Sequence, residues 1–298
     1  MLFIVSAAAV CFAGYKNYNG VQPHSDSPMS SEEGRLKGVF SVSDSCKVIF
    51  SQGNLQYHAA TNTWRFAEHQ WDLIGMGYSL ADYELNNIAG GTLADCSNIK
   101  IDSIYNGWID LFGWGTGDAP TRSGMNDSGY SMFVDWGTNP ISNGGNKSGI
   151  WRVLTKDEWV YLINTRAGAR KKYGAAKVNG IAGVVILPDK WILPEGCSFK
   201  AGMTCTRIWY DWSLVARTNI YSAARWKKME ANGAVFLPAA GFRNGTSVYD
   251  AGARGYYWFS TAESIHYACY LRFYSYNLSP TSYDDRYHGF SVRLVSDR

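Results

Sequence analysis

The chemistry most evident in this sequence is ligand binding by aromatic and charged side chains near the C-terminus. Tyr270, Arg272, Tyr274 and Tyr276 lie between or beside the apolar residues Leu271 and Phe273. A period of two is typical of a β-strand with one buried face. We therefore expect Leu271 and Phe273 in the core and the row containing Tyr270, Arg272 and Tyr274 in solvent. Tyrosine provides rigid contact area with few rotamers to freeze, so this row is typical of a binding surface.

The same stretch is unusual in the residue types that it lacks. From Tyr256 to His288 there is no Lys, Gln or Met, and its one Glu is Glu263. Changing only the adenines of the asparagine codon AAC yields Tyr, Phe, Ser, Ile, His, Asp, Cys, Arg and Thr, but never Lys, Gln, Met, Glu or Trp. The composition fits mutagenesis directed at adenines; the alternative is a surface that happens to be aromatic and poor in lysine. The predicted ligand contacts are Tyr257, Phe259, Ser264, Ile265, His266, Tyr267, Cys269, Tyr270, Arg272, Tyr274, Tyr276, Ser282, Tyr283, Asp284, Asp285 and His288.

Three segments carry a resemblance to a known family: LPAAGFRNGTSVYDAG (237–252), RGYYWFST (254–261) and RYHGFSVRLV (286–295). They resemble the variable proteins diversified by diversity-generating retroelements, in the form found in gut Bacteroidales and their phages. WRVLTKDEWVYL (151–162) is similar to a segment of the related formylglycine-generating-enzyme family. The resemblance implies a C-type-lectin-like fold whose exposed varied residues bind ligand. Phe259 stands where the family usually has Ser, either as a varied position or as a departure.

No residue pattern indicates an enzyme or a firm metal site. The sequence has five His, of which His266 and His288 lie in the region expected to vary, and it has no GxSxG, HExxH or GxxxxGK motif. The oxidases of the formylglycine-generating family need a reactive cysteine pair, whereas Cys269 is alone in its region. Asp118, Asp127 and Asp135 lie in a long Gly/Asn-rich loop without the spacing of an EF-hand. They either supply a structural calcium site or form Asx-turns.

Composition limits the class of partner. The net charge of +3 is too small to indicate nucleic acid or an anionic membrane surface as the partner. With 298 residues and 46% hydrophobic content, the chain can bury a large core without disulfides. Cys197 and Cys205 could pair with each other, or remain buried thiols.

The chain divides into three parts. Residues 1–14 form an apolar, signal-like leader, which predicts export, with a buried strand as the alternative. Any membrane contact would then come through that leader or a lipid anchor. Residues 15–37 are polar and Gly/Pro-rich, as in a linker. Residues 38–298 are expected to form one domain, with a variable binding region over about 246–288.

Within that domain the patterns predict an α+β fold with two main helices, short antiparallel sheets and long loops. Thr155 and Glu158 have the spacing of a capping box and start a helix over 155–166. Ser222 is a candidate N-cap for a second helix over 222–232, and a short helix is expected over 81–87. Strands near the start of the domain are expected to pair with the C-terminal strand.

Two functions fit these observations. The first is a surface-displayed protein of the adhesin or receptor-binding type, whose varied residues bind a protein or glycan on another cell or on a phage. Display on a pilus, among its subunits, or on a phage particle is compatible with it. The second is a lectin-like or phage receptor-binding domain of fixed specificity, without diversification. An oxidase of the formylglycine-generating kind is a third and weaker candidate.

Overall fold

The computed structural model describes residues 32–74, 107–204, 212, 219–245 and 247–298. The helix expected over 81–87 and the leader lie outside these ranges. Two α-helices occur in the described part, α2 (Lys156–Val160) and α3 (Ala223–Ala231). Short 3-10 or π-turns occur at Glu32–Gly34, Asp127–Tyr130, Trp136–Thr138, Tyr161–Thr165 and Ala169–Lys171. No helix in the described part is long and apolar enough to cross a membrane.

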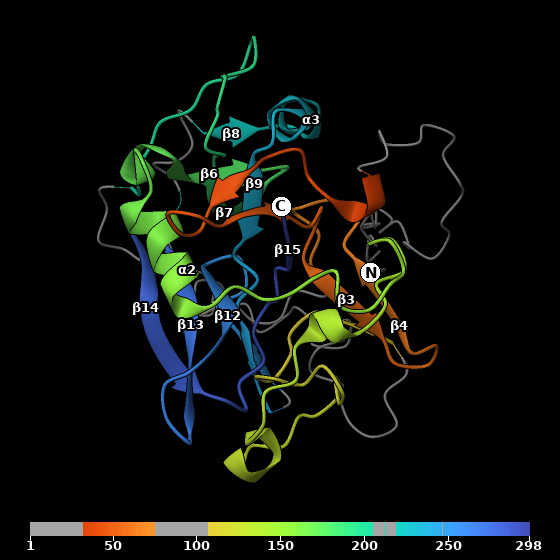
Figure 1. Ribbon diagram of the computed structural model, residues 1–298. Coiled ribbons are helices and arrows are strands. Elements are labelled where there is room, and N and C mark those ends of the chain that lie inside the picture. The colour runs from red at the N-terminus through yellow and green to blue at the C-terminus, as the bar shows by residue number, and fades with distance from the viewer. Residues whose placement is uncertain (1–31, 75–106, 205–211, 213–218, 246) are drawn as a thin grey trace, which may run out of the picture. The chain divides into compact units, whose positions relative to one another are not determined.

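In the described part of the chain, most of the regular secondary structure is β-strand, arranged in five small sheets (Figure 1). Four sheets are antiparallel throughout, and the sheet β8-β6-β7-β9 has one parallel pair, β6 with β8. The strands are β1 (Phe40–Ser41), β2 (Lys47–Phe50), β3 (Leu55–His58), β4 (Thr63–Phe66), β5 (Trp108–Ile109), β6 (Tyr173–Val178), β7 (Ile181–Ile186), β8 (Ile220–Tyr221), β9 (Val235–Pro238), β10 (Phe242–Asn244), β11 (Ser247–Tyr249), β12 (Arg254–Ala262), β13 (Tyr267–Tyr274), β14 (Asn277–Asp285) and β15 (Val295–Asp297). They form the sheets β1-β2-β15, β4-β3-β5, β8-β6-β7-β9, β10-β11 and β12-β13-β14.

The predicted fold class is therefore wrong. The described chain is mainly β, with helices of only five and nine residues, rather than an α+β, C-type-lectin-like fold. The two helices do start where their caps predicted: Thr155 Oγ1 accepts from the Glu158 amide, and Ser222 Oγ from the Arg225 amide. Residues 161–165 leave the α-helical pattern for a π-turn, so the first helix ends early. Capping chemistry fixes where a helix begins, but tertiary packing decides how far it extends.

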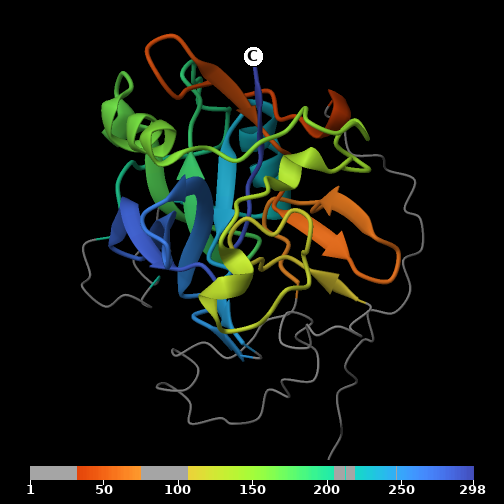
Figure 2. The same ribbon diagram turned by 60° about the horizontal axis from the view of Figure 1, so that its bottom comes forward.

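The prediction that early strands pair with the C-terminal strand is confirmed. β15 lies antiparallel to β2, with Val295 opposite Phe50 and Asp297 opposite Val48. Figure 2 shows the C-terminal end of the chain beside the β1–β2 hairpin, which is drawn in red at the top of the view. The closing strand has only three residues, because residues before Val295 make only isolated bridges.

Two hydrophobic clusters enclose the three-stranded sheet β12-β13-β14, named here the C-terminal sheet. One contains Phe40, Trp159 and Leu271; the other contains Trp64, Trp258 and Phe290. A further cluster lies under α3. Because both faces of the C-terminal sheet meet a cluster, alternation along its strands does not by itself separate core from solvent.

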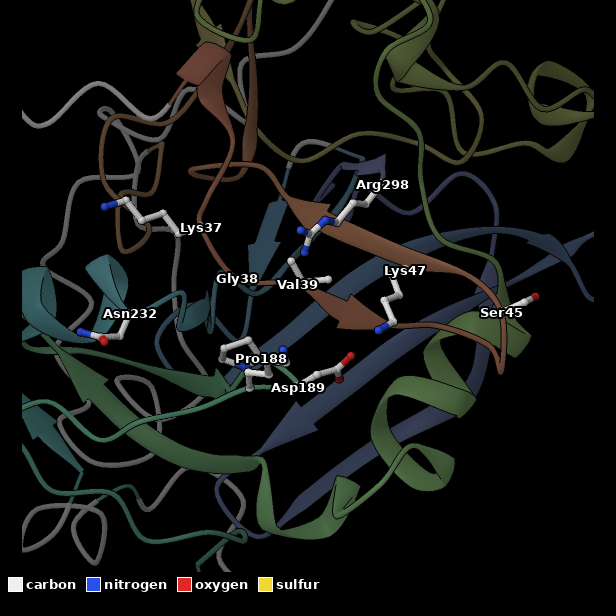
Figure 3. Close-up of a pocket in the computed structure, with 10 residues that line it drawn as sticks. Lys37, Gly38, Val39, Ser45, Lys47, Pro188, Asp189, Asn232 and Arg298 are labelled. Carbon is white, nitrogen blue, oxygen red and sulfur yellow. The ribbon is translucent and has the colours of Figure 1, made fainter.

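A pocket of about 640 Å³ opens at the edge of the sheet β1-β2-β15 (Figure 3). Its wall comes from the residues before β1, the β1–β2 turn, the segment after β7 and the C-terminal end of β15. None of these residues belongs to the predicted ligand contacts. The lining residues are Lys37, Gly38, Val39, Ser45, Lys47, Pro188, Asp189, Lys190, Asn232 and Arg298.

Candidate binding surface on the C-terminal sheet

The register of the C-terminal sheet assigns each predicted contact to one of its two faces. Leu271 lies opposite Tyr257, and Cys269 lies opposite Tyr283. Directly opposed residues in an antiparallel pair project to the same side. Tyr257, Cys269, Leu271 and Tyr283 therefore share one face, named here the helix face because α2 packs on this sheet. Neighbouring β13 residues, such as Tyr270, project from the second face.

The helix face contains the predicted core residues. Leu271 and Phe273 are fully buried, as the sequence predicted. Phe259 is also fully buried and stacks on Trp159 of α2, with ring centroids 5.7 Å apart and planes inclined by 21°. Gly255 faces Phe273, and a Cβ there would lie 2.0 Å from the ring, so only glycine fits. The helix is thus seated on the sheet by aromatic packing.

The second face contradicts the predicted exposure of Tyr270. This side chain is 3% exposed and packs against Tyr256 and Phe290, with ring centroids 5.7 and 4.8 Å away. Burial raises the pKa of Tyr270, and the nearby Asp284 carboxylate raises it further. The expected exposed row fails at Tyr270 because an aromatic cluster covers this end of the strand.

Other predicted contacts are also buried and are corrected here to framework residues. Tyr257 donates its hydroxyl to the Pro238 carbonyl at 2.8 Å and accepts from Asn54 Nδ2 at 3.2 Å. His288 is 8% exposed and lies edge-on to Phe242, with centroids 5.3 Å apart. Bulky or specifically bonded side chains of this kind cannot be exchanged freely without a loss of stability. The buried members of the predicted set are Tyr257, Phe259, Cys269, Tyr270 and His288.

A second group of predicted contacts forms an exposed patch at the tip of the β12–β13 hairpin, named here the tip patch. Ile265 is 75% exposed and Tyr283 is 57% exposed. The rings of Tyr267 and Tyr283 lie 5.7 Å apart, so the two tyrosines form one surface. Large apolar side chains grouped in solvent are typical of interaction sites. The tip patch consists of Ser264, Ile265, His266, Tyr267 and Tyr283.

A third group lies half-buried along the other face and its edge, named here the arginine patch. The Arg272 guanidinium lies 5.6 Å from the centre of the Tyr274 ring, which is 4.7 Å from the Tyr276 ring. Arg272 Nε is buried without a hydrogen-bond acceptor among the described residues. A half-buried guanidinium held over an aromatic ring is suited to contacts with polar or aromatic groups of a ligand. The arginine patch consists of Arg272, Tyr274, Tyr276, Ser282 and Asp284.

The structure adds residues to the arginine patch that the sequence analysis missed. Asp250 Oδ2 accepts from the Tyr256 hydroxyl at 2.7 Å and lies 3.4 Å from Arg254 Nη1. The Arg254 guanidinium lies 5.8 Å from the Tyr274 ring, on the opposite strand from Arg272. Burial and the Asp250 carboxylate raise the pKa of Tyr256, so its hydroxyl stays protonated and donates.

The β10–β11 hairpin lies at the edge of the arginine patch. Tyr249 is 39% exposed and stacks on Phe242 at 5.3 Å. The sequence signal that could have located it is the Asn244–Gly245 turn, with Gly245 at φ 57°. Such a turn predicts a hairpin that places Tyr249 opposite Phe242.

One cluster of predicted contacts could hold a metal ion. Ligand atoms of Asp284, Asp285 and His288 all lie within 4.8 Å of one another. The same residues also have partners within the protein: His288 Nδ1 lies 3.1 Å from Asp284 Oδ1, and the Tyr287 hydroxyl donates to Asp285 Oδ2 at 3.0 Å.

The acidic residues of the long loop behave differently from one another. Asp135 Oδ1 accepts from the Gly137 amide at 2.9 Å, and its Oδ2 accepts from the Val153 amide at 3.0 Å. Burial raises the pKa of this carboxyl despite those bonds. Asp135 thus forms the Asx-turn that was the alternative to calcium binding. Asp118 is exposed, and the side chain of Asp127 lies outside the described part.

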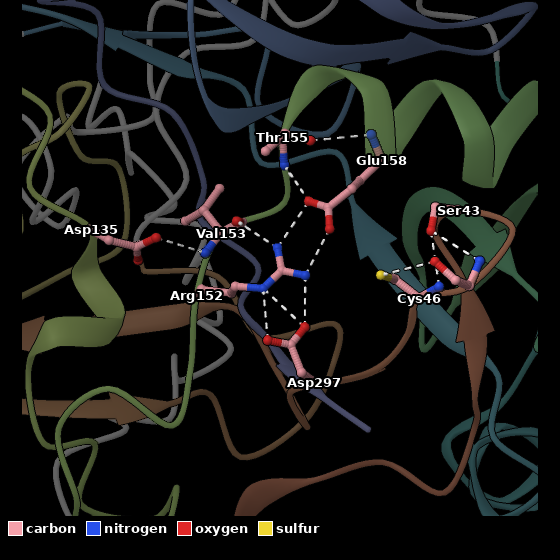
Figure 4. Close-up of polar contacts among 9 residues, drawn as sticks. Ser43, Cys46, Asp135, Arg152, Val153, Thr155, Glu158 and Asp297 are labelled. Atoms are coloured by element: carbon pink, nitrogen blue, oxygen red, sulfur yellow. Dashed lines mark hydrogen bonds and ion pairs between the residues drawn. The ribbon is translucent and has the colours of Figure 1, made fainter.

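A polar network holds α2 in place, and Figure 4 shows the part of it that surrounds Arg152. The Arg152 guanidinium joins Glu158 at 2.7 Å to Asp297 at 2.7 Å, which connects the helix to β15. On the hairpin side, the Lys156 amide donates to Thr261 Oγ1 at 3.0 Å and Lys156 Nζ pairs with Glu263 at 3.0 Å. The hairpin that carries the tip patch is therefore held against α2 by these contacts.

The described cysteines do not form disulfides. Cys46 is exposed, Cys197 is half-buried and Cys269 is buried, and all three thiols are free. Cys269 Sγ donates to Glu263 Oε2 at 3.2 Å. Cys205, the suggested partner of Cys197, lies outside the described residues.

Comparison with known proteins gives one match. A family model described as a domain of unknown function (DUF8237) matches residues 207–295, which include the C-terminal sheet. No curated protein matches the chain. No solved structure matches it either, so the lectin fold implied by the resemblance is not identified.

Proposed function

We propose that this protein is an exported, surface-displayed binding protein of the adhesin or receptor-binding type, whose C-terminal region is diversified by a retroelement. The observation that carries the proposal is the tip patch. Ile265, Tyr267 and Tyr283 expose large apolar area on a hairpin that Lys156 and Glu263 brace against a helix. Exposed aromatic side chains on a rigid base are the arrangement with which interfaces gain most of their binding energy.

The division between exposed and buried residues supports diversification of this region. The motif residues Trp258, Phe290 and Val292 are at most 1% exposed, so the segments that resemble the variable-protein family form the core. Between them lies the tip patch, whose side chains make few contacts with the core. Substitution there would change the surface and leave the packing intact. A fixed framework with exchangeable surface positions is the physical requirement for such a protein.

The contact set is narrower than the sequence predicted. The framework residues identified above leave it, and Arg254 and Tyr249 join it at the margin of the arginine patch. The proposed contacts are Ser264, Ile265, His266, Tyr267, Arg272, Tyr274, Tyr276, Ser282, Tyr283, Asp284, Asp285, Tyr249 and Arg254.

We propose a protein or glycan on another cell or phage surface as the ligand. The tip patch is suited to apolar protein contacts. The arginine patch offers stacking faces and hydrogen bonds that a sugar or a polar loop could use. Display at a bacterial surface, among pilus subunits or on a phage particle is compatible with these surfaces.

The second candidate is the same binding protein with a fixed specificity. Cys269, Tyr270 and His288 favour it, because they are residue types that adenine mutagenesis would produce and yet they are buried. Random replacement at those positions would damage the aromatic cluster or the helix face. If a retroelement diversifies this protein, the codons of Cys269, Tyr270 and His288 should therefore not be among those that adenine-directed mutagenesis changes.

The DNA that flanks the gene distinguishes the two candidates. Diversification requires a reverse-transcriptase gene and a template copy of the region that differs from the gene only at adenines. We expect the differing codons to be those of the tip and arginine patches and not those of Tyr257, Phe259 or Tyr270. A flank without such a copy would leave fixed specificity as the function.

A further inference from the structure

A second surface, separate from the C-terminal sheet, has the character of an anion-binding pocket. It is the 640 Å³ pocket lined by Lys37, Lys47, Lys190 and Arg298 (Figure 3). Its volume falls within the range of about 300–1,000 Å³ that is usual for small-ligand sites. The pocket is formed by other elements than the tip and arginine patches, so this inference does not depend on the proposed function.

The cations of the pocket lack partners within the described part of the chain. None of the four side chains makes an ion pair there, whereas the arginines at positions 35, 152, 166 and 254 all do. In Figure 3, Lys47 and Arg298 lie near each other, and the Lys37 side chain lies apart from them and points away. The positive charge is therefore spread over the pocket instead of being concentrated at one point.

The carboxylate among the lining residues, that of Asp189, is already paired with groups of the protein. Asp189 Oδ2 accepts from the Ser41 amide at 2.9 Å and from Ser41 Oγ at 2.6 Å, and Oδ1 accepts from Arg166 Nη1 at 3.1 Å. Burial opposes ionisation of Asp189, but these hydrogen bonds outweigh it and lower its pKa. Asp189 is thus an ionised structural group that compensates the buried Arg166.

Further positive charge lies directly behind the pocket wall. Lys172 Nζ donates to the Asp189 carbonyl at 2.8 Å. Burial lowers the pKa of Lys172, and the neighbouring Arg166 lowers it further. The lining side chains thus include four cations and one carboxylate, and that carboxylate is already paired with Arg166, so the side chains of the pocket carry a net positive charge. Ser45 and Asn232 add neutral groups that can hydrogen-bond with a ligand.

We infer that this pocket binds a small ligand that carries two or more phosphate or sulfate groups. Unpaired lysine and arginine side chains are the usual partners of such groups. The separation of the cations across the pocket favours a ligand with several acidic groups over one with a single charge. The pocket constitutes a second binding site on a protein whose first surface is aromatic.

Titration calorimetry tests the inference with pyrophosphate and a disulfated disaccharide as probes and inorganic phosphate as the single-group comparison. We expect at least one of the two probes to bind at least tenfold more tightly than phosphate, and to weaken as the salt concentration rises. Lys47→Gln and Arg298→Gln should each lower its affinity about fivefold. Lys147→Gln removes the same charge from an exposed loop outside the pocket and should change the affinity by less than twofold.

Three outcomes would overturn the inference. The first is binding of pyrophosphate and the disaccharide no tighter than that of phosphate. The second is an unchanged affinity in both pocket variants, with their melting temperatures equal to that of the parent protein. The third is an equal loss in Lys147→Gln, which would show general attraction to a positive surface. If the disaccharide binds and pyrophosphate does not, the ligand is a sulfated sugar; the reverse result identifies a phosphate compound.

Discussion

Tyr270 and Leu271 are adjacent on β13, project from opposite faces of the C-terminal sheet, and are both buried, at 3% and 0% exposure. Leu271 belongs to the cluster that contains Trp159, and Tyr270 to the cluster that contains Phe290. A strand with one solvent-exposed face would expose either Tyr270 or Leu271. The sheet thus acts as a partition between two cores along most of β13, and it reaches solvent only toward its ends and its outer edge.

The first prediction concerns stability along this strand. Tyr270→Ala should lower the free energy of unfolding by about 3 kcal/mol, because it removes a ring from a packed aromatic cluster. Tyr274→Ala, four residues further along the strand and on the same face, should lower it by about 1 kcal/mol or less, because that side chain is only half-buried. Urea denaturation of both variants provides the measurement. Equal losses would show that the arginine patch is part of the core.

The second prediction concerns tolerance to substitution. In a displayed library scored by protease resistance, most substitutions at Ile265, His266 and Tyr283 should leave the folded fraction unchanged, because these side chains lie in solvent. Substitutions at Phe259 and Cys269 should mostly abolish the folded state, because they would leave cavities or unpaired polar groups beneath α2.

This comparison also tests the proposed binding surface. The buried positions serve as the matched control because they lie on β12 and β13, the two strands that the loop with Ile265 and His266 connects. A tip that tolerated no more changes than Phe259 or Cys269 would be a structural element, and the proposal of an exchangeable surface would fail. A buried set as tolerant as the tip would show that the packing described here is not formed.

The third prediction concerns alkaline pH. Burial raises the pKa of the hydroxyls of Tyr221, Tyr256, Tyr257 and Tyr270 above the ordinary value of 10.0. In the unfolded chain these groups lose protons near pH 10, while in the folded chain they keep them. The unfolded state therefore binds fewer protons above pH 10, and stability falls as the pH rises.

An opposing contribution comes from Arg293, whose pKa burial lowers to about 10, so that its stability term rises with pH in the same range. The tyrosines outnumber it, and net destabilisation is expected. Urea unfolding at a series of pH values, together with phenolate absorbance, measures the effect. Tyr257→Phe removes one of the titrating groups and should reduce the slope of the loss. A stability that stayed level above pH 10 would contradict the burial of these rings.

The fourth prediction concerns thiol reactivity. Hydrogen bonds from Ser43 and Ser45 lower the pKa of the exposed Cys46 thiol, whereas burial raises the pKa of Cys269 to about 11. The thiolate is the reactive form, so a thiol reagent at mildly alkaline pH should label Cys46 quickly and Cys269 only on unfolding. Peptide mapping after timed labelling identifies the sites, and Cys46→Ser should remove the fast phase. Fast labelling of Cys269 in the folded protein would contradict the packing of the helix face.

Local patterns predicted a substantial part of this structure. The Thr155–Glu158 capping box and the Ser222 cap located the starts of both helices, because capping depends on residues within one turn. Alternation predicted the burial of Leu271 and Phe273. Neither pattern fixes how many elements cover a sheet. The α+β expectation failed because the two helices that the caps begin span only five and nine residues, whereas most of the regular structure is formed by strands.

The sequence by itself determined the chemistry of the C-terminal region: rows of tyrosine and arginine, a strand period of two, and motifs whose apolar residues must lie inside. Only the tertiary structure decided which of those tyrosines reach solvent. Tyr257 and Tyr270 are buried while Tyr267 and Tyr283 are exposed, although all four belong to the same short stretch. The physical reason is that burial depends on what packs against each face of a sheet. For this sheet, Trp159 packs on one side and the cluster around Phe290 on the other. These partners come from distant segments or from beyond the turn that follows β14.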